Sequence, residues 1–381
     1  MEIFIGLMTG TSLDGLDLAA VSFQPDDHQP KIQLHAATTI DLPAQLIQQL
    51  RQLCHQSEIS IHMLGQCHSW LGDFYAESIH SFIEQFQLDR QQIKAIGSHG
   101  QTIRHCPPTT DNAHPFTLQI GDPARIAIKT GFTTVADFRS NDLAAGGQAA
   151  PLAPAFHQWL FHSPLQNRAV VNIGGISNLT LLTADPHQPV IGFDCGPGNL
   201  LMDHWCMQHL QQPYDKDGQW AASGDFNPQL LEQLLSEPYL QLPIPKSTGR
   251  ELFNPQWLNQ QLSQFSLLIE NNPIAENDIQ ATLLEFTAIT IAQSLKQHSS
   301  QTEQLFICGG GAYNSQLKKR LQHYLKDISV ATTEQIGLSP DLVEAVAFAW
   351  LAQQRLQQQP SGLPSVTGAK AATIQGAVWL P

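Results

Sequence analysis

The stretch IGLMTGTSLDGLD, residues 5–17, decides how this chain is interpreted. It places a turn rich in glycine and hydroxyl groups between two apolar runs, which predicts two strands joined by a tight hairpin. Such a turn can offer backbone N–H groups and hydroxyls to phosphate oxygens. Surface turns use the same residue types, so an ordinary surface turn that binds no phosphate is an alternative interpretation of this stretch. The candidate phosphate-binding residues are Gly10, Thr11, Ser12, Leu13, Asp14, Gly15, Leu16 and Asp17, with Asp14 or Asp17 able to hold Mg²⁺ through water.

A second glycine-rich stretch, GFDCGPGN at residues 192–199, follows another apolar run. Strands expected at 169–173, 177–182 and 190–194 repeat the order expected at 2–8, 16–23 and 31–40. This echo predicts two related α/β halves and, with the two glycine-rich turns, an ATP-using phosphotransferase. A P-loop is excluded because no Gly-x-x-x-x-Gly-Lys-[Ser/Thr] sequence is present. The candidate nucleotide-binding glycines of this half are Gly174, Gly175, Gly196, Gly309, Gly310 and Gly311.

Asp194 lies at the end of an apolar strand and is followed by glycines that allow close backbone approach. A carboxylate in that position can accept a proton from a hydroxyl group or from water. The structural alternative is an aspartate that caps the next helix. Glu344 lies within an apolar helical stretch, where a glutamate usually faces solvent.

Polar residues follow three further strands, expected at 93–98, 116–120 and 133–137, the first two of them buried. Ligands of α/β proteins bind outside the carboxyl ends of strands, so these three ends are candidates as a set. From them, Ser98, His99, Asp122 and Arg139 are expected to bind the substrate. The alternative is that Arg139 forms a surface or interdomain ion pair and binds no ligand.

Composition limits the class of protein. The chain has 381 residues, 42% of them hydrophobic, and a formal net charge of −14. This length predicts two domains, and the negative charge disfavours nucleic acids and anionic membranes as partners. Six scattered cysteines without a Cys-x-x-Cys pair predict reduced thiols in the cytoplasm rather than disulfides or a zinc site. The expected domains are 1–140, which the tail at about 366–381 can join, and 141–365.

Taken in order, these segments resemble the anhydro-N-acetylmuramic acid kinases of the actin/hexokinase/Hsp70 ATPase superfamily. The resemblance runs almost from end to end, and the combination is more specific than any single motif. One departure is Cys195, where a small polar residue such as threonine is more usual. The matching stretches are 6–17, 97–102, 118–126, 136–139, 145–148, 172–176, 192–199, 309–314 and 344–349.

The resemblance implies two RNase-H-like α/β domains flanking an ATP cleft, with Mg²⁺ as cofactor. It implies that 1,6-anhydro-N-acetylmuramic acid is opened by water and phosphorylated on O6, in the recycling of peptidoglycan in the cytoplasm. It also implies that Asp194 is the catalytic base and that Glu344 contacts the sugar. Kinases of this family are often dimers, which leaves a homodimer open.

Two other functions are compatible with the same sequence. The first is a kinase of another amino sugar, which would phosphorylate an existing hydroxyl group instead of using water. The second is a non-enzymatic ATP-dependent binding module, which would need a separate peptide-binding domain. A DNA-binding regulator is disfavoured because no basic helix-turn-helix stretch is evident.

Overall fold

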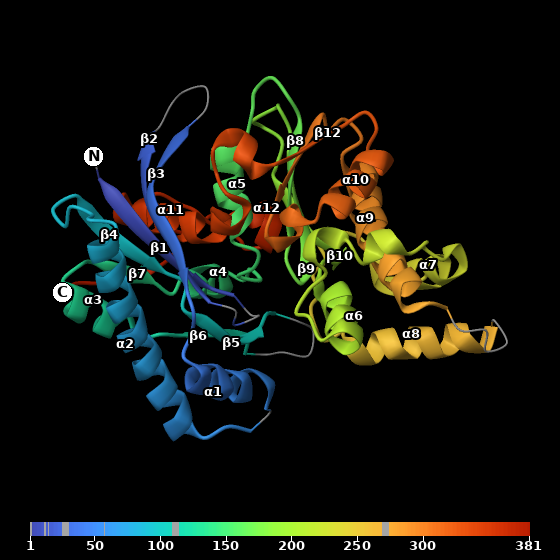
Figure 1. Ribbon diagram of the computed structural model, residues 1–381. Helices are drawn as coiled ribbons and strands as arrows, with labels where there is room; N and C mark the ends of the chain where they lie inside the picture. The colour runs from blue at the N-terminus through green and yellow to red at the C-terminus, as the bar shows by residue number, and fades with distance from the viewer. Residues whose placement is uncertain are drawn as a thin grey trace. The chain divides into compact units, whose positions relative to one another are not determined.

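The computed structural model describes residues 2–10, 13, 15–24, 30–56, 58–108, 114–268 and 274–381. Contacts divide the chain into two compact units, and both combine helices with a β-sheet (Figure 1). Unit 1 comprises Met1–Leu160 and Leu342–Pro381, and unit 2 comprises Phe161–Asp341. The mixed α/β fold class predicted from the sequence is confirmed.

Unit 1 is built on a six-stranded sheet in the order β13-β7-β4-β1-β2-β3. The antiparallel β1–β2 hairpin contains the stretch that opened the sequence analysis, and β4 continues the sheet parallel to β1. The strands are β1 (Ile3–Thr9), β2 (Leu16–Gln24), β3 (Lys31–Ile40), β4 (Ile93–Ser98), β7 (Thr134–Ala136) and β13 (Ala377–Trp379). The helices are α1 (Ala44–His55), α2 (Ile61–Gln85), α3 (Pro123–Thr130), α4 (Ser140–Ala144), α5 (Ala153–Phe161, which ends at the division), α11 (Val343–Leu356) and α12 (Pro364–Thr367).

Two glycines let α11 pack directly on the sheet of unit 1. Gly6 of β1 and Gly97 of β4 are register neighbours. A Cβ on Gly6 would overlap the carbonyl oxygen of Ala345, and one on Gly97 would overlap that of Phe348. The missing side chains therefore make room for the helix backbone. The sequence-based boundaries at 140/141 and 365/366 differ from the contact division, which assigns α11 to unit 1 through this packing.

Unit 2 has a five-stranded sheet in the order β10-β9-β8-β11-β12. As in unit 1, the first strands form an antiparallel hairpin, and β11 lies parallel to β8. The strands are β8 (Arg168–Ile173), β9 (Ile176–Leu182), β10 (Ile191–Pro197), β11 (Gln304–Cys308) and β12 (Ser329–Thr332). The helices are α6 (Leu200–Leu210), α7 (Pro228–Leu235), α8 (Pro255–Leu268), α9 (Glu276–His298) and α10 (Ser315–Tyr324).

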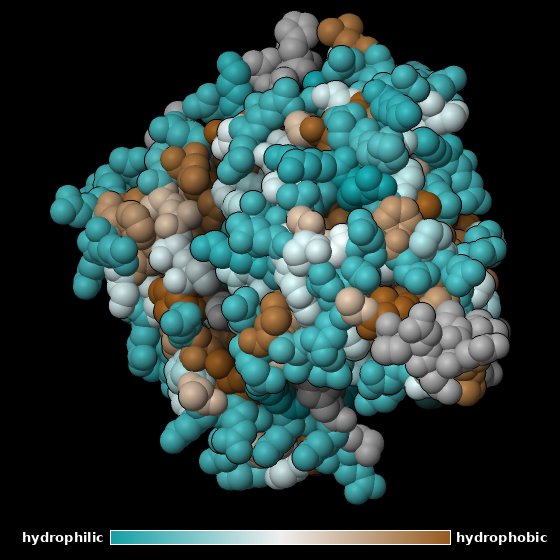
Figure 2. Space-filling model, turned by 45° about the vertical axis from the view of Figure 1, so that its right-hand side comes forward, coloured by the Kyte–Doolittle hydropathy of each residue, from teal (hydrophilic) through white to brown (hydrophobic). Residues whose placement is uncertain are grey.

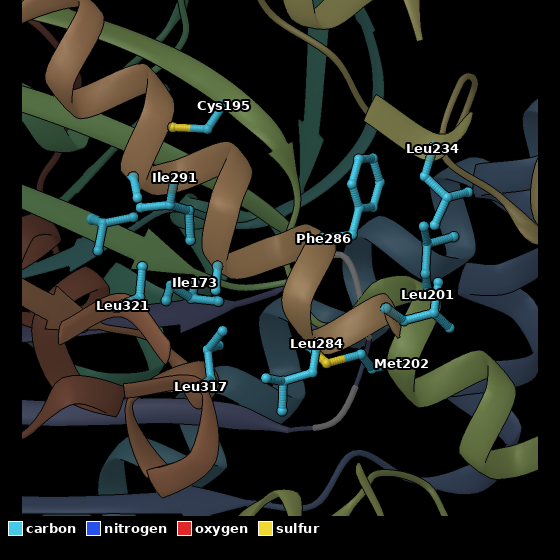
Figure 3. Packing of buried hydrophobic residues seen from close by; sticks show 14 of the residues in the cluster. Ile173, Cys195, Leu201, Met202, Leu234, Leu284, Phe286, Ile291, Leu317 and Leu321 are labelled. Atoms are coloured by element: carbon cyan, nitrogen blue, oxygen red, sulfur yellow. The ribbon is translucent and has the colours of Figure 1, made fainter. Parts of the chain in front are cut away.

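The core of unit 2 forms around α9, which is buried along most of its length. Figure 3 shows Phe286 and Ile291 of this helix among leucines from the surrounding helices, with Cys195 of β10 beside them. Cys195 is 1% exposed, and burial raises the pKa of its thiol. The side chain that departs from the family pattern is thus a neutral core group.

The surface carries the expected polar character. Hydrophilic side chains predominate on the face drawn in Figure 2, with hydrophobic residues scattered among them. Within the described ranges, no helix is both long enough and apolar enough to cross a membrane. None of the six cysteines is joined to another by a disulfide in the structure.

The strand at 116–120 was predicted to be buried and is not, and the strand at 101–106 was not predicted. β6 (Phe116–Ile120) is partly exposed and pairs with β5 (Gln101–Cys106) in a separate two-stranded sheet, rather than lying buried in the main one. β5 alternates only weakly and carries two charged or titratable side chains, Arg104 and His105. A short hairpin of this kind is stabilised by packing that sequence periodicity does not show.

Candidate active site

The three polar strand ends of unit 1 meet at one pocket of about 330 Å³. Ser98 and His99 line it from the end of β4, Asp122 from the turn after β6, and Asp137 from the turn after β7. Its size falls at the lower end of the range for small-molecule sites, which suits a single sugar. The three ends named as candidates from the sequence thus line one pocket, and their contacts with a substrate stay a prediction.

Ser98 lines this pocket and has an unsatisfied, buried hydroxyl group. Its side chain is fully buried, and its Oγ has no hydrogen-bond partner within the described residues. A buried hydroxyl without a partner is costly, so a ligand oxygen or a water molecule is its natural partner.

His99 and Arg139 form a buried pair at the same place. The Nε and Nη2 atoms of Arg139 donate to Nε2 of His99 over 3.2 and 3.0 Å. His99 Nδ1 lies 2.8 Å from the carbonyl oxygen of Gly100 and donates to it. Burial, helped by the neighbouring guanidinium, lowers the pKa of His99 to about 3. The imidazole is therefore neutral at physiological pH.

Arg139 is a cation with acidic neighbours. Its Nη1 donates to the carbonyl oxygen of Ala149 over 2.6 Å. Burial lowers its pKa to about 10, against the opposing effect of Glu344 and then Asp142. At that pKa the guanidinium keeps its charge at neutral pH. The alternative role for Arg139 was a surface or interdomain ion pair. Within the described residues, the acidic groups that act on Arg139 are Glu344 and Asp142, and both belong to its own unit.

Glu344 combines solvent access with an unfavourable environment for its charge. It lies at the start of α11 and is exposed at its surface. The pKa of its carboxyl is raised, mainly because the surrounding protein removes water from it. The positive charge of Arg139 acts against this rise, and the negative charge of Asp17 adds to it. The carboxyl group is thus linked electrostatically both to the sugar candidates and to the hairpin of β1 and β2.

Asp122 already has a structural task. It caps α3, because its Oδ1 accepts from the backbone N–H groups of Ala124 and Arg125 over 3.0 and 3.2 Å. Its Oδ2 lies 3.4 Å from Nε of Arg125. These contacts fix the carboxylate at the rim of the pocket and leave it less free to bind a sugar hydroxyl.

Two residues at this pocket were not selected from the sequence. Asp137 has a left-handed backbone with φ of 53°, and its Oδ1 accepts from Ser140 Oγ over 2.6 Å. Backbone strain of this kind collects at ligand sites, and both side chains line the pocket. The strand end containing Asp137 was identified, but only Arg139 was chosen from it.

The phosphate hairpin of unit 1 is described only in part. Thr11, Ser12 and Asp14 lie outside the described residues, so their contacts and the expected magnesium ligand stay predictions. Leu13 and Leu16 are core residues, and the N–H of Leu13 donates to Gly10 over 3.2 Å. These two leucines are available to a nucleotide only through their remaining backbone groups.

Gly15 and Asp17 are held against β3. A Cβ on Gly15 would lie 2.7 Å from Cγ2 of Thr39, so glycine is needed for this approach. Oδ1 of Asp17 accepts from Thr39 Oγ1 over 2.6 Å. Both residues fix the hairpin to its sheet.

Asp194 lies at a β-bulge of unit 2. It pairs with Asn178 and Gly196 pairs with Ser177, so Cys195 is the extra residue between them. A bulge re-aims the neighbouring side chains, and bulges are common beside active sites. Oδ2 of Asp194 accepts from the N–H of Thr248 over 2.9 Å.

The environment of Asp194 suits a base at neutral pH. Burial raises its pKa to about 6, the Thr248 hydrogen bond acts against that rise, and Glu251 adds to it. The residue is thus mostly ionised at pH 7, yet basic enough to take a proton. The helix-cap alternative is not seen: α6 is preceded by Asn199, and Asp194 bonds instead to the 246–248 segment.

The segment 246–248 was not identified from the sequence. The Lys246 carbonyl accepts from the N–H of Asp194 over 3.1 Å, and Tyr239 Oη donates to the Asp194 carbonyl over 2.9 Å. These partners lie 45 to 54 residues away in the chain. The only sequence signal is a polar, glycine-containing run, KSTGR at 246–250, after a proline-rich turn.

The glycines of unit 2 divide into open and packed positions. A Cβ on Gly174, Gly175 or Gly310 would find its nearest atom 3.7–3.8 Å away, which is an ordinary van der Waals contact, so a one-carbon side chain would fit at all three positions. Gly174 and Gly175 accept from the N–H groups of residues 198–200, which ties this turn to the start of α6. Open glycine backbone at strand ends leaves room for a flat or phosphate-bearing ligand.

The other candidate glycines are required by packing. Gly309 has φ of 75°, and a Cβ there would overlap Oδ1 of Asn172. Gly311 faces Ile173, and Gly196 faces Leu240 at 3.2 Å. These three glycines shape the loops, and the nucleotide-binding role of Gly174, Gly175 and Gly310 stays a prediction.

A family model described as anhydro-N-acetylmuramic acid kinase matches residues 2–381. The chain belongs to the anhydro-N-acetylmuramic acid kinase family. A relative of that name from Coxiella burnetii is 48% identical over 378 residues, covering 99% of this chain and 97% of the relative. Another, from Pseudomonas fluorescens, is 49% identical over 381 residues, covering 100% and 99%. The family resemblance stated from the sequence is therefore confirmed.

Solved structures similar to this kinase-family chain are more distant. The activator of the 2-hydroxyisocaproyl-CoA dehydratase from Clostridium difficile, with bound ADPNP, is 13% identical with a TM-score of 0.43, covering 93% of this chain and 96% of its own. A ROK family glucokinase from Streptomyces griseus, in complex with glucose and AMPPNP, is 9% identical with a TM-score of 0.41, covering 92% and 99%.

Proposed function

We propose that this protein is an ATP-dependent kinase that opens 1,6-anhydro-N-acetylmuramic acid with water and phosphorylates O6. The product is N-acetylmuramic acid 6-phosphate, an intermediate in peptidoglycan recycling. The observation that carries the proposal is the match of 48–49% identity along nearly the whole length of relatives named for this activity. The partly buried carboxyl of Asp194, with its pKa near neutrality, supplies the base that the reaction needs.

The bond changes balance with ATP and one water molecule. The water oxygen forms a bond to C1 as the C1–O6 bond of the anhydro bridge breaks. O6 then bonds to the γ-phosphorus as the bond to the β–γ bridging oxygen breaks and ADP leaves. Asp194 takes the proton of the attacking water, and its hydrogen bond from Thr248 holds the carboxylate in one orientation.

The strand ends of unit 1 and the start of α11 supply groups that suit the sugar. Arg139 carries the positive charge that would bind the lactyl carboxylate, and Ser98 offers an unpaired buried hydroxyl. Glu344 would accept a hydrogen bond from a sugar hydroxyl. The first two roles follow from charge and unsatisfied hydrogen bonding, and they are independent of the resemblance.

ATP is proposed to bind through the glycine backbone of unit 2, and the hairpin of unit 1 stays a predicted phosphate-binding element. At Gly174, Gly175 and Gly310 the nearest atom to an added Cβ would lie 3.7–3.8 Å away, so these glycines are the least closely packed of the nucleotide-binding candidates in unit 2. Mg²⁺ would neutralise charge on the phosphates when bound. Carboxylates of the hairpin, Asp14 or Asp17, are the hard oxygen ligands that this ion prefers. Cysteines that form no disulfide in the structure suit the reducing cytoplasm, where we place the reaction.

The test is the mass of the product formed from ATP and the anhydro sugar. We expect a sugar heavier by one phosphate and one water, with stoichiometric ADP, and little turnover of ordinary hexosamines. Phosphorylation of a hexosamine in preference to the anhydro sugar would favour the other sugar-kinase reading. Absence of turnover with every sugar, despite nucleotide binding, would favour the binding module.

A further inference from the structure

We propose that His99 is a positioning residue that fixes the Arg139 guanidinium, and that it does not itself bind the sugar. This inference rests on the proposed function, because it assigns the sugar carboxylate to Arg139. It changes the role expected for His99 from the sequence, where its place at a strand end made it a candidate for direct binding.

Both ring nitrogens of His99 are already engaged in hydrogen bonds within the protein. Nδ1 donates to the carbonyl of Gly100, which can only accept, so the ring proton lies on Nδ1. Nε2 is then the acceptor, and two donors of Arg139 converge on it. Neither nitrogen is left for a sugar hydroxyl, and the low pKa of the ring rules out a second proton near neutral pH.

The second argument is that the rest of the ring is fixed by packing. The imidazole lies against Phe348 of α11, with centroids 4.6 Å apart, and Phe348 contacts Phe138 at 5.5 Å. His99 is only 5% exposed. The ring therefore presents one lone pair to Arg139 from a fixed position, which lowers the freedom of the guanidinium before a ligand arrives.

The third argument concerns the other side of Arg139. Its Nη1 donates to Ala149, whose own N–H donates to Oδ2 of the buried Asp142 over 2.7 Å. Oδ1 of Asp142 accepts from Thr367 of α12 over 2.8 Å. The guanidinium is thus held from two sides, by His99 and by the loop that Asp142 orders. A guanidinium has five N–H donors, so two of them remain beyond these three contacts.

The experiment is a double-mutant cycle in the full chain. His99→Phe keeps the ring and loses the acceptor, His99→Gln can restore an acceptor near Nε2, and Arg139→Met removes the guanidinium. We expect His99→Phe to raise the KM for the anhydro sugar about tenfold, with the KM for ATP unchanged. In the Arg139→Met background the same change should have less than about a twofold effect, since coupled residues are not additive. His99→Gln should recover most of the loss.

Two controls keep the outcome decisive. His157→Phe removes another buried imidazole of unit 1, on α5, and should leave both KM values unchanged. Histidine ¹⁵N spectra of the wild type, with the His99 signal assigned from its loss in His99→Gln, should show a neutral ring protonated on Nδ1 between pH 5 and 8. The spectra are informative even if His99→Phe fails to fold.

Three results would overturn the proposal. Equal effects of His99→Phe with and without Arg139 would mean that His99 contacts the sugar directly. A His99→Gln variant as impaired as His99→Phe would remove the acceptor role. A ring protonated on Nε2, or charged, would contradict the geometry. A wild-type protein inactive on the anhydro sugar would sink the proposed function instead, and the spectra would still test the His99–Arg139 arrangement.

Discussion

Asp194 shows how burial and one hydrogen bond set the chemistry of a single residue. The carboxyl is held by Thr248 at a bulge, which aims it, and burial brings its pKa toward neutrality. Desolvation favours the protonated form and the N–H of Thr248 favours the ionised form. The balance leaves a base that is ionised at pH 7 and still able to accept a proton.

Asp194→Asn should bind ATP and the sugar but lose turnover. Asparagine keeps an oxygen for the Thr248 N–H but cannot take a proton, so kcat should fall by about 10²–10⁴ with little change in the binding constants. Steady-state kinetics with calorimetric binding measure both quantities. Asp185→Asn, at an exposed turn, is the matched control and should keep wild-type kcat. A near-normal kcat in Asp194→Asn would remove Asp194 from the role of base.

The pH dependence follows from the same carboxyl. The base works when deprotonated, so kcat/KM should rise with pH through about 6, the raised pKa of Asp194 in the free protein. His99 cannot produce this limb, because its pKa lies near 3. A pH–rate profile between 4.5 and 8.5 measures it. A profile flat from pH 4.5 upward would show that the critical base titrates elsewhere.

Stability should move in the opposite direction to activity at this position. Because the pKa of Asp194 is raised from 3.8 to about 6 on folding, its contribution to stability is full below pH 3.8 and is lost as pH rises through 6. Asp194→Asn avoids that loss, so its free energy of unfolding should exceed that of the wild type by about 2 kcal/mol at pH 8, with a smaller difference near pH 4.5. Urea denaturation at the two pH values checks this. A variant less stable than the wild type at pH 8 would contradict it.

At the scale of elements, two neighbouring glycines of unit 2, Gly309 and Gly310, are expected to have different roles. Gly310→Ala places a methyl group 3.7 Å from its nearest neighbour, the Nδ2 atom of Asn199, so it should cost little stability. It should raise the KM for ATP about tenfold and leave the kcat at saturating ATP close to normal, because the methyl group would crowd a bound nucleotide. Gly309→Ala, one residue earlier, is strained by its φ of 75° and by Asn172, so it should cost about 1–3 kcal/mol of stability. Nucleotide titrations and denaturation curves distinguish the two. Equal ATP affinity of Gly310→Ala and wild type would place the nucleotide elsewhere.

The sequence predicted most elements, for identifiable reasons. β4 is a short, mainly apolar run followed by polar turn residues, and it was predicted with the bounds observed. β5 was missed because its polar residues pair only with β6. The assignment of α11 to unit 1 depends on Gly6 and Gly97 lying side by side, a long-range fact that no local pattern carries.

The site was predictable in its positions and not in its contacts. Strand ends pointed to Ser98, His99 and Asp122, which do line one pocket. The sequence could not show that Asp122 is occupied as a helix cap or that His99 has both nitrogens engaged. Nor could it show that the partner of Asp194 is Thr248, 54 residues away. Such details depend on tertiary packing, which places residues far apart in the chain within hydrogen-bond distance.

At the scale of the whole molecule, we expect the anhydro sugar to contact the pocket of unit 1 and ATP to contact the glycine loops of unit 2. In hydrogen–deuterium exchange, the anhydro sugar should protect amides around 98–100 and 137–140, which border the pocket of unit 1. A non-hydrolysable ATP analogue should protect amides around 173–176 and 309–313 in unit 2. Sugar protection confined to unit 2 would contradict the assignment.

The most direct test of the central claim follows the oxygen of water. The wild-type protein is incubated with ATP and anhydro sugar in H₂¹⁸O, and the product is analysed at once by mass spectrometry with fragmentation. A sample of unlabelled product in the same water controls for exchange at C1. The account predicts one ¹⁸O at C1 and none in the phosphate of the sugar, with formation of this species lost in Asp194→Asn. Label in released inorganic phosphate, or a phosphorylated product that keeps its anhydro bridge, would contradict it.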